Sequence, residues 1–83
     1  MTDWRLQGQE SYLMGDTLFS KHYADRKTDT DHDHCEFCGE KFSETIPNAL
    51  TIGFATASDY RWICNQCFKD FQETFQFKIG NTN

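Results

Sequence analysis

The residues of this chain that could do chemistry are four cysteines, arranged as two pairs of identical spacing. Cys35 and Cys38 form the first pair, Cys64 and Cys67 form the second, and residues 39–63 separate the pairs. This pattern is typical of a tetrahedral zinc site, because zinc favours four ligands and binds cysteine sulfur well. It therefore predicts one Zn²⁺ held by all four cysteines. Such a closed ligand set leaves no position for water or substrate, so the predicted zinc is structural.

The short length of the chain makes this metal important for folding. A chain of 83 residues forms one domain at most, and its core is marginal without a staple. Zinc binding contributes roughly 10 kcal/mol or more to folding, and eight Phe, three Tyr and two Trp supply apolar surface. We expect a single zinc-stabilised domain over residues 1–83, with an N-terminal helix and strand (1–23), a polar linker (24–34) and a zinc-binding core (35–79).

The elements that must position the cysteines are predicted from residue patterns and form an α+β fold. The N-terminal part is predicted as a helix over 3–14 and a strand over 17–23. Two runs of β-forming residues, 50–56 and 60–64, are predicted to form a hairpin. A terminal helix is expected over 65–77, because its phenylalanines recur at helical spacing.

The residues that follow each cysteine pair differ. Gly39 follows the first pair, where a tight turn requires the positive φ that glycine adopts without strain. Phe68 follows the second pair and opens an apolar stripe that continues through Phe71 and Phe75. The first pair is therefore predicted to lie in a turn, and the second at the start of a helix.

This order of turn, hairpin, cysteine pair and helix over 34–77 resembles the treble-clef zinc finger. The resemblance depends on Gly39 after the first pair, on the strand 60–64, and on Phe68 entering the helix. It implies a structural zinc and a small α+β finger with the N-terminal helix and strand packed on it. Residues 4–9, Trp-Arg-Leu-Gln-Gly-Gln, extend the similarity to a family of small, uncharacterised bacterial zinc-binding proteins, which implies no particular activity.

One alternative is a metal-dependent nuclease. The run Asp-His-Asp-His at 31–34 is similar to that of HNH-type nucleases, in which histidine activates water beside a catalytic divalent ion. In that family the run lies between the cysteine pairs, whereas here it precedes Cys35. His32 or His34 could also replace one cysteine as a ligand, although two complete pairs make this unnecessary. We expect a solvated polar linker instead.

Two further alternatives use the same cysteines for redox chemistry. Rubredoxin holds iron with two similar pairs, and a tetrahedral set of four sulfurs accepts either zinc or iron. Rubredoxin repeats the glycine after its second pair, whereas this chain has Phe68 there, which favours zinc. A thioredoxin-like dithiol at Cys64 and Cys67 would need a βαβ context that the chain is too short to supply.

The charge and composition point to a protein partner. The formal net charge is −5, and the basic residues are scattered, which disfavours binding to the phosphate backbone of nucleic acids. The first residues contain no apolar run, and no stretch is long enough to cross a membrane. We therefore expect a non-catalytic cytoplasmic protein that mediates protein–protein interaction or regulation. Aromatic residues left exposed are candidates for its binding surface.

Overall fold

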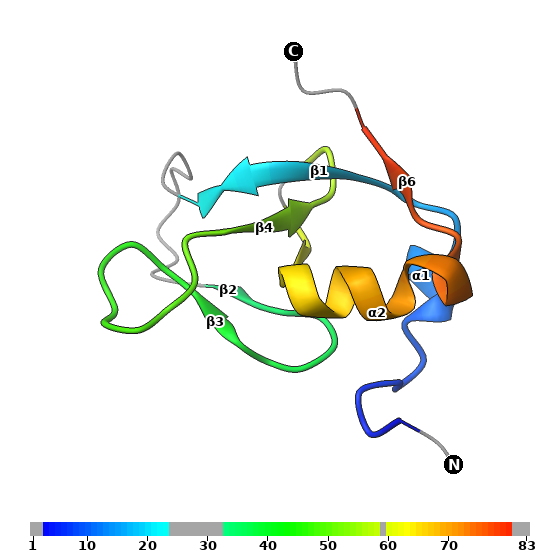
Figure 1. The fold of residues 1–83 in the computed structure, drawn as a ribbon, viewed down its shortest axis with the longest axis horizontal. Coiled ribbons are helices and arrows are strands. Elements are labelled where there is room, and N and C mark those ends of the chain that lie inside the picture. Colours follow the sequence, from blue (N-terminus) through cyan, green and yellow to red (C-terminus); the bar gives the residue numbers. More distant parts are fainter. Residues whose placement is uncertain (1–2, 24–32, 59, 81–83) are drawn as a thin grey trace.

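The fold is built on a four-stranded mixed sheet with a helix against it (Figure 1). The computed structural model describes residues 3–23, 33–58 and 60–80. The strands of the sheet lie in the order β5 (Trp62–Ile63), β4 (Ile52–Ala55), β1 (Thr17–His22) and β6 (Lys78–Ile79). β4 is antiparallel to both β5 and β1, and β6 is parallel to β1. The predicted α+β class is confirmed, and the predicted N-terminal strand lies inside the sheet.

The first cysteine pair lies at the turn of a second, two-stranded sheet. Its strands are β2 (Asp33–His34) and β3 (Lys41–Phe42), which pair antiparallel. This β2–β3 hairpin with its turn at 35–40 is called the knuckle below. It is joined to the main sheet by a backbone hydrogen bond of 2.9 Å from the Glu36 N–H to the Trp62 carbonyl oxygen. The two sheets are therefore linked directly beside the cysteines.

The terminal helix, α2 (Asn65–Phe75), begins at the second cysteine pair. It ends earlier than the predicted bound of 77, because Gln76 adopts a left-handed conformation with φ of 57°. The Gln76 N–H still donates to carbonyl oxygens of the last helical turn, so the end is capped. The chain then turns into β6, a strand that the sequence pattern did not predict.

The prediction of a helix over 3–14 is wrong in its extent. The helix α1 contains only Glu10–Leu13, because Gly8 has a φ of +93° that no right-handed helix accommodates. The residues before Gly8 form a turn, in which the Leu6 N–H donates to the Asp3 carbonyl oxygen at 3.0 Å. Neither α1 nor α2 is long and apolar enough to cross a membrane.

Two other predictions need adjustment. Residues 24–32 of the predicted linker lie outside the described residues. The last two residues of that linker, Asp33 and His34, form β2. Asp33 is held there because its carboxylate accepts a 2.8 Å hydrogen bond from the Tyr23 hydroxyl. The predicted hairpin is present as β4 and β5, with shorter strands than expected. The division of the chain into 1–23, 24–34 and 35–79 stays a prediction.

The core consists of two aromatic clusters on opposite faces of the sheet. One cluster packs between β4 and α2, where the rings of Phe54 and Phe68 stack with their centroids 3.7 Å apart. The other lies on the knuckle side, where Trp62 contacts Tyr23 at 5.0 Å and Phe42 at 5.3 Å between ring centroids. Most of the aromatic side chains are therefore buried in the core, where they supply the apolar surface that so short a chain needs.

Candidate metal centre

The four cysteines converge at one point between the knuckle hairpin and the start of α2. Their Sγ atoms all lie within 4.8 Å of one another, and none of them forms a disulfide. Cys38 Sγ and Cys64 Sγ are 3.7 Å apart. A tetrahedron with metal–sulfur bonds of about 2.3 Å has edges of about 3.8 Å. The cluster can therefore hold one metal ion in the geometry that four thiolates prefer.

Backbone N–H groups of the knuckle position the first pair. Gly39 has the expected positive φ, +81°, and its N–H donates to the Cys35 carbonyl oxygen at 3.1 Å to close the turn. Cys35 Sγ accepts hydrogen bonds of 3.4 Å from the N–H groups of Phe37 and Cys64. Such donors stabilise the thiolate form that binds metal. The backbone thus prepares Cys35 for ligation.

The start of α2 positions the second pair. Cys64 is the N-cap of the helix, and its Sγ accepts a 3.4 Å hydrogen bond from the Cys67 N–H. A sulfur in this position meets the positive end of the helix dipole, which favours a thiolate. Cys67 lies one turn into the helix and is only 1% exposed. Both ligands therefore project from a rigid element.

The thiols differ in how easily they ionise. Burial raises the pKa of Cys38 to about 11, and the neighbouring sulfurs add to this effect. Burial likewise raises the pKa of Cys67, with a further contribution from the charge of Cys35. Burial opposes ionisation of Cys35 as well, but the N–H donors of Cys64, Cys38 and Phe37 outweigh it and lower its pKa. Four thiolates so close together repel one another, and a divalent cation at their centre relieves this repulsion.

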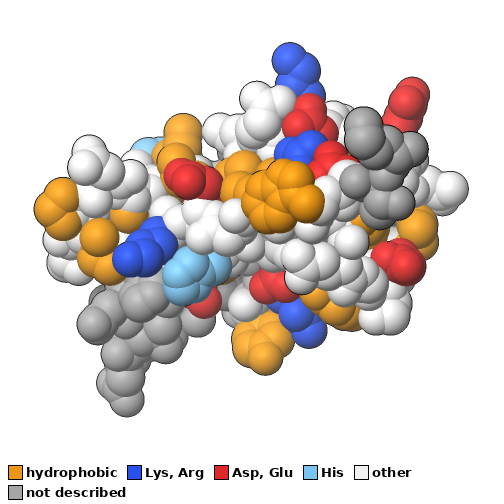
Figure 2. Space-filling view, turned by 90° about the horizontal axis from the view of Figure 1, so that it is seen from below, with side chains coloured by type: hydrophobic (Ala, Val, Ile, Leu, Met, Phe, Trp, Pro, Cys, Tyr) orange, Lys and Arg blue, Asp and Glu red, His pale blue; other side chains and the backbone are white. Residues whose placement is uncertain are grey.

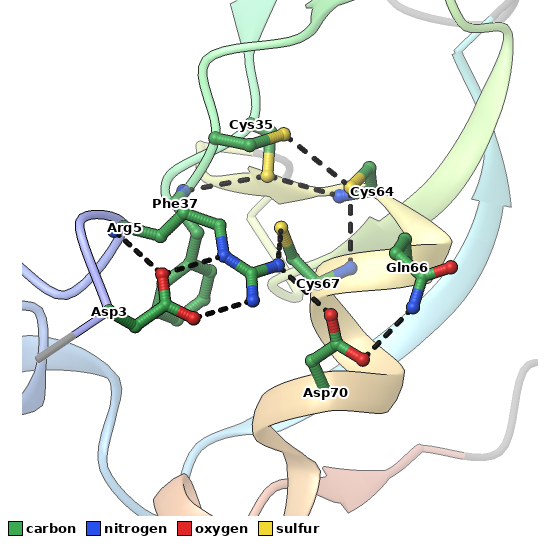
Figure 3. Close-up of polar contacts among 9 residues, drawn as sticks. Asp3, Arg5, Cys35, Phe37, Cys64, Gln66, Cys67 and Asp70 are labelled. Atoms are coloured by element: carbon green, nitrogen blue, oxygen red, sulfur yellow. Dashed lines mark hydrogen bonds and ion pairs between the residues drawn. The ribbon is translucent and has the colours of Figure 1, made fainter. Parts of the chain in front are cut away.

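Arg5 reaches the cluster from the N-terminal segment (Figure 3). Its Nη1 donates to Cys67 Sγ at 3.4 Å and to Asp70 Oδ2 at 3.0 Å. Its Nε and Nη2 form a fork on the Asp3 carboxylate, at 3.0 and 2.7 Å, and the guanidinium carbon lies 4.5 Å from the centre of the Phe71 ring. The N-terminal segment is thereby fastened to the metal centre by one largely buried cation.

The pairing of Arg5 is mutual. Hydrogen bonds from Arg5 lower the pKa of Asp3 to about 2. Hydrogen bonds from Arg5 and Gln66 lower the pKa of Asp70 as well, and the carboxylates in turn raise the pKa of Arg5. All three groups are therefore charged at neutral pH. The sequence analysis did not select Arg5, because nothing in its local pattern indicates a partner 62 residues away.

Gln9 is a second residue that the sequence analysis missed. Its side chain is only 3% exposed. Its Nε2 donates to the carbonyl oxygens of Arg5 at 2.8 Å and of Glu36 at 3.0 Å, and its Oε1 accepts from the Gln7 N–H at 2.7 Å. Gln9 thus ties the turn that carries Arg5 to the first cysteine pair. A glutamine beside Gly8 in a turn was the only local signal.

Only one histidine of the proposed nuclease motif lies in the described part of the chain. His32 lies outside the described residues, and His34 lies on β2. Within the described part of the chain, the four cysteines are the only group of three or more Cys, His, Asp or Glu side chains placed to share a metal. The nuclease hypothesis receives no support from this arrangement and stays untested.

Comparison with known proteins adds no relative to this description. The chain matches no protein-family model, no curated protein and no solved structure at a significant level. The interpretation of the metal centre therefore depends on the geometry of its own residues.

Proposed function

We propose that the chain is a small zinc-binding module in which one structural Zn²⁺ joins the knuckle hairpin to the terminal helix. The observation that carries this proposal is the convergence of the four cysteine sulfurs within 4.8 Å from these two elements. β2 and β3 have only two residues each and α1 has four. Elements so short are not stable alone, so a metal that joins them contributes directly to folding.

The same elements support assignment of the finger to the treble-clef type. A knuckle with Gly39 in its turn comes first, the β4–β5 hairpin follows, and the second cysteine pair opens α2. The helical position of Phe68 also favours zinc over a rubredoxin-like iron centre, in which both pairs occupy equivalent turns. The free thiols favour a reducing compartment such as the cytoplasm.

We further propose that the module is non-catalytic and acts by binding another protein. Several aromatic side chains remain exposed although the core has taken most of them. Trp4 and Tyr60 are each 68% exposed, and Tyr12 is 42% exposed. Trp and Tyr are enriched at the centres of protein interfaces. In Figure 2, exposed hydrophobic side chains lie interspersed with acidic and basic ones.

Metal analysis combined with chelation tests this proposal. Purified protein should contain one zinc per chain and be colourless, and a strong chelator should abolish both its circular dichroism signal and its cooperative melting transition. A red, redox-active protein would favour the iron alternative. Full secondary structure and an unchanged melting temperature after complete metal removal would refute the structural role.

A further inference from the structure

A groove of about 730 Å³ lies beside the metal centre, within the size range of ligand sites. The N-terminal segment contributes residues 3–5 to its lining, the knuckle contributes Cys38 and Glu40, and the start of α2 contributes Cys64 and residues of its first turn. Cys38 is only half-buried, unlike the other three ligands. The sulfur side of the metal centre is therefore open to a ligand along this groove.

The charge of the groove favours a cation. Four thiolates around one Zn²⁺ carry a charge of about −2, and the carboxylate of Glu40 adds to it on the same wall. Arg5 donates to Cys67 Sγ, but it also pairs with the carboxylates of Asp3 and Asp70, so these three charged side chains together stay negative and do not cancel the charge of the metal centre. Within the described residues no cation pairs with Glu40. An anionic ligand would meet repulsion here, whereas a cationic one would be attracted.

Arg5 itself demonstrates which cation suits this surface. Its guanidinium donates to the sulfur of Cys67 and to the carboxylates of Asp3 and Asp70 (Figure 3). It also lies over the aromatic ring of Phe71. The groove offers the same three kinds of partner again: the sulfur of Cys38, which is also a metal ligand, the carboxylate of Glu40 and the exposed indole of Trp4. A guanidinium is weakly hydrated and stacks flat on an indole, so arginine fits this combination better than lysine.

We propose that this groove binds an arginine side chain presented by a partner protein. The guanidinium lies over the Trp4 indole, donates to Glu40 and meets the negative charge of the metal centre near Cys38. This inference rests on the proposed function, since the thiolate charge requires the bound metal. It names the chemistry of the partner segment, a peptide that presents an arginine side chain.

Titration of the zinc-loaded full chain with short peptides tests this inference. We would use Ac-Gly-Arg-Gly-Arg-Gly-NH₂ and its lysine and glutamate analogues, followed by ¹H–¹⁵N NMR at low salt. The arginine peptide should shift resonances of residues lining the groove, such as Gln66, while the glutamate peptide should not. The lysine peptide should bind at least about threefold more weakly. Equal binding of the arginine and lysine peptides would overturn the assignment.

Matched variants separate a specific site from a general charge effect. Glu40→Gln and Trp4→Leu should each weaken arginine-peptide binding about fivefold or more. Glu44→Gln removes the same charge outside the groove, so this variant should bind as the parent chain does. An equal loss in Glu40→Gln and Glu44→Gln would refute the site.

The metal content of the same samples keeps the two proposals distinguishable. A sample without bound zinc, or with zinc that can be removed without unfolding, contradicts the proposed function before any peptide is added. A sample that is zinc-loaded and folded but shows no groove shifts with the arginine peptide refutes this inference alone.

Discussion

The two cysteine pairs share a spacing, yet the fold holds them by different means. The first pair lies in a turn, and backbone N–H groups serve Cys35. The second pair lies on a helix, where Cys64 acts as the N-cap and Cys67 receives Arg5 from a distant part of the chain. Cys35 accepts hydrogen bonds from backbone N–H groups, one in its own turn and one at Cys64, whereas Cys67 accepts one from a side chain, that of Arg5. One spacing motif therefore covers two distinct structural solutions.

Replacement of the metal ligands should give the largest effects. It also tests whether Cys64 stabilises α2 as its N-cap in addition to binding the metal. Cys38→Ala and Cys64→Ala should each weaken zinc binding about 100-fold or more, because roughly 10–16 kcal/mol of binding is shared among four ligands. Cys64→Ala also removes the N-cap, worth about 1 kcal/mol, and should be about fivefold weaker than Cys38→Ala. Competition with a chromophoric chelator measures both affinities.

Serine variants provide the control for this difference. Serine is a good N-cap but a poor zinc ligand, so Cys64→Ser should recover about fivefold over Cys64→Ala. At Cys38, which caps no helix, serine and alanine should be equivalent. Equal behaviour at both positions would show that the cap adds nothing to metal binding.

Phe68, which directly follows the second cysteine pair, tests how much the packing of α2 against the sheet stabilises the fold. Phe68 is only 5% exposed and stacks on Phe54, so Phe68→Ala should lower the free energy of unfolding by about 3–5 kcal/mol. Denaturant unfolding of the zinc-loaded chain measures this loss. Phe68→Leu keeps much of the volume and should remain folded with a smaller loss, while Tyr60→Ala at an exposed site should change stability by about 0.5 kcal/mol or less. A Phe68→Ala variant as stable as the parent would contradict the packing role.

The sequence predicted those features whose cause is local. The positive φ of Gly39 and the phenylalanine stripe of α2 each follow from residues a few positions apart. The convergence of the two cysteine pairs was predictable for another reason, because one metal ion needs all four sulfurs. The N-terminal helix was predicted too long because the apolar spacing of 3–14 outweighed Gly8, whose conformation ends any helix there. Periodicity alone cannot show which glycines adopt positive φ.

The sequence could not predict the features that depend on tertiary contacts. β6 is two residues long and pairs in parallel with β1. A strand this short shows no alternating pattern of apolar and polar residues from which it could be predicted. Arg5 and Gln9 act on the metal centre through partners far along the chain, Cys67 and Glu36. Polar residues in a turn carry no local sign of such contacts. The sequence pattern predicts only that the strand over 17–23 packs on the finger. Its position inside the sheet, as β1 between β4 and β6, depends on pairing with strands far along the chain.

Replacement of Arg5 tests whether the second cysteine pair needs a side-chain donor to hold the metal. Arg5→Ala removes the donor to Cys67 and the contact with Phe71, and we expect a loss of about 1–2 kcal/mol in the free energy of unfolding. It should also raise the rate of zinc release, because Cys67 loses a hydrogen bond to its sulfur. Stopped-flow chelation measures this rate.

Arg61→Ala is the matched control for Arg5. Arg61 also pairs with a carboxylate, Glu36 at 3.5 Å, and lies over aromatic rings, those of Tyr12 and Tyr60. It makes no hydrogen bond to a cysteine sulfur among the contacts of the described residues. Its loss should leave zinc release unchanged, and equal acceleration in both variants would show that Arg5 acts only through general stability.

The smallest expected effect concerns the turn that holds the first pair. A Cβ added at Gly39 meets no atom within 4 Å, so the cost of Gly39→Ala comes from the backbone alone, about 1 kcal/mol for a left-handed conformation. Gly15→Ala is a matched control, with positive φ and open space but a place between α1 and β1. Both variants should lose similar stability in denaturant unfolding. Only Gly39→Ala should also speed zinc release, because the hydrogen bond that closes the knuckle is between Gly39 and a ligand, Cys35. If zinc release responds to Gly15→Ala as strongly, the backbone of the knuckle has no special role, and the distinction between a pair held by its turn and a pair held by its helix fails.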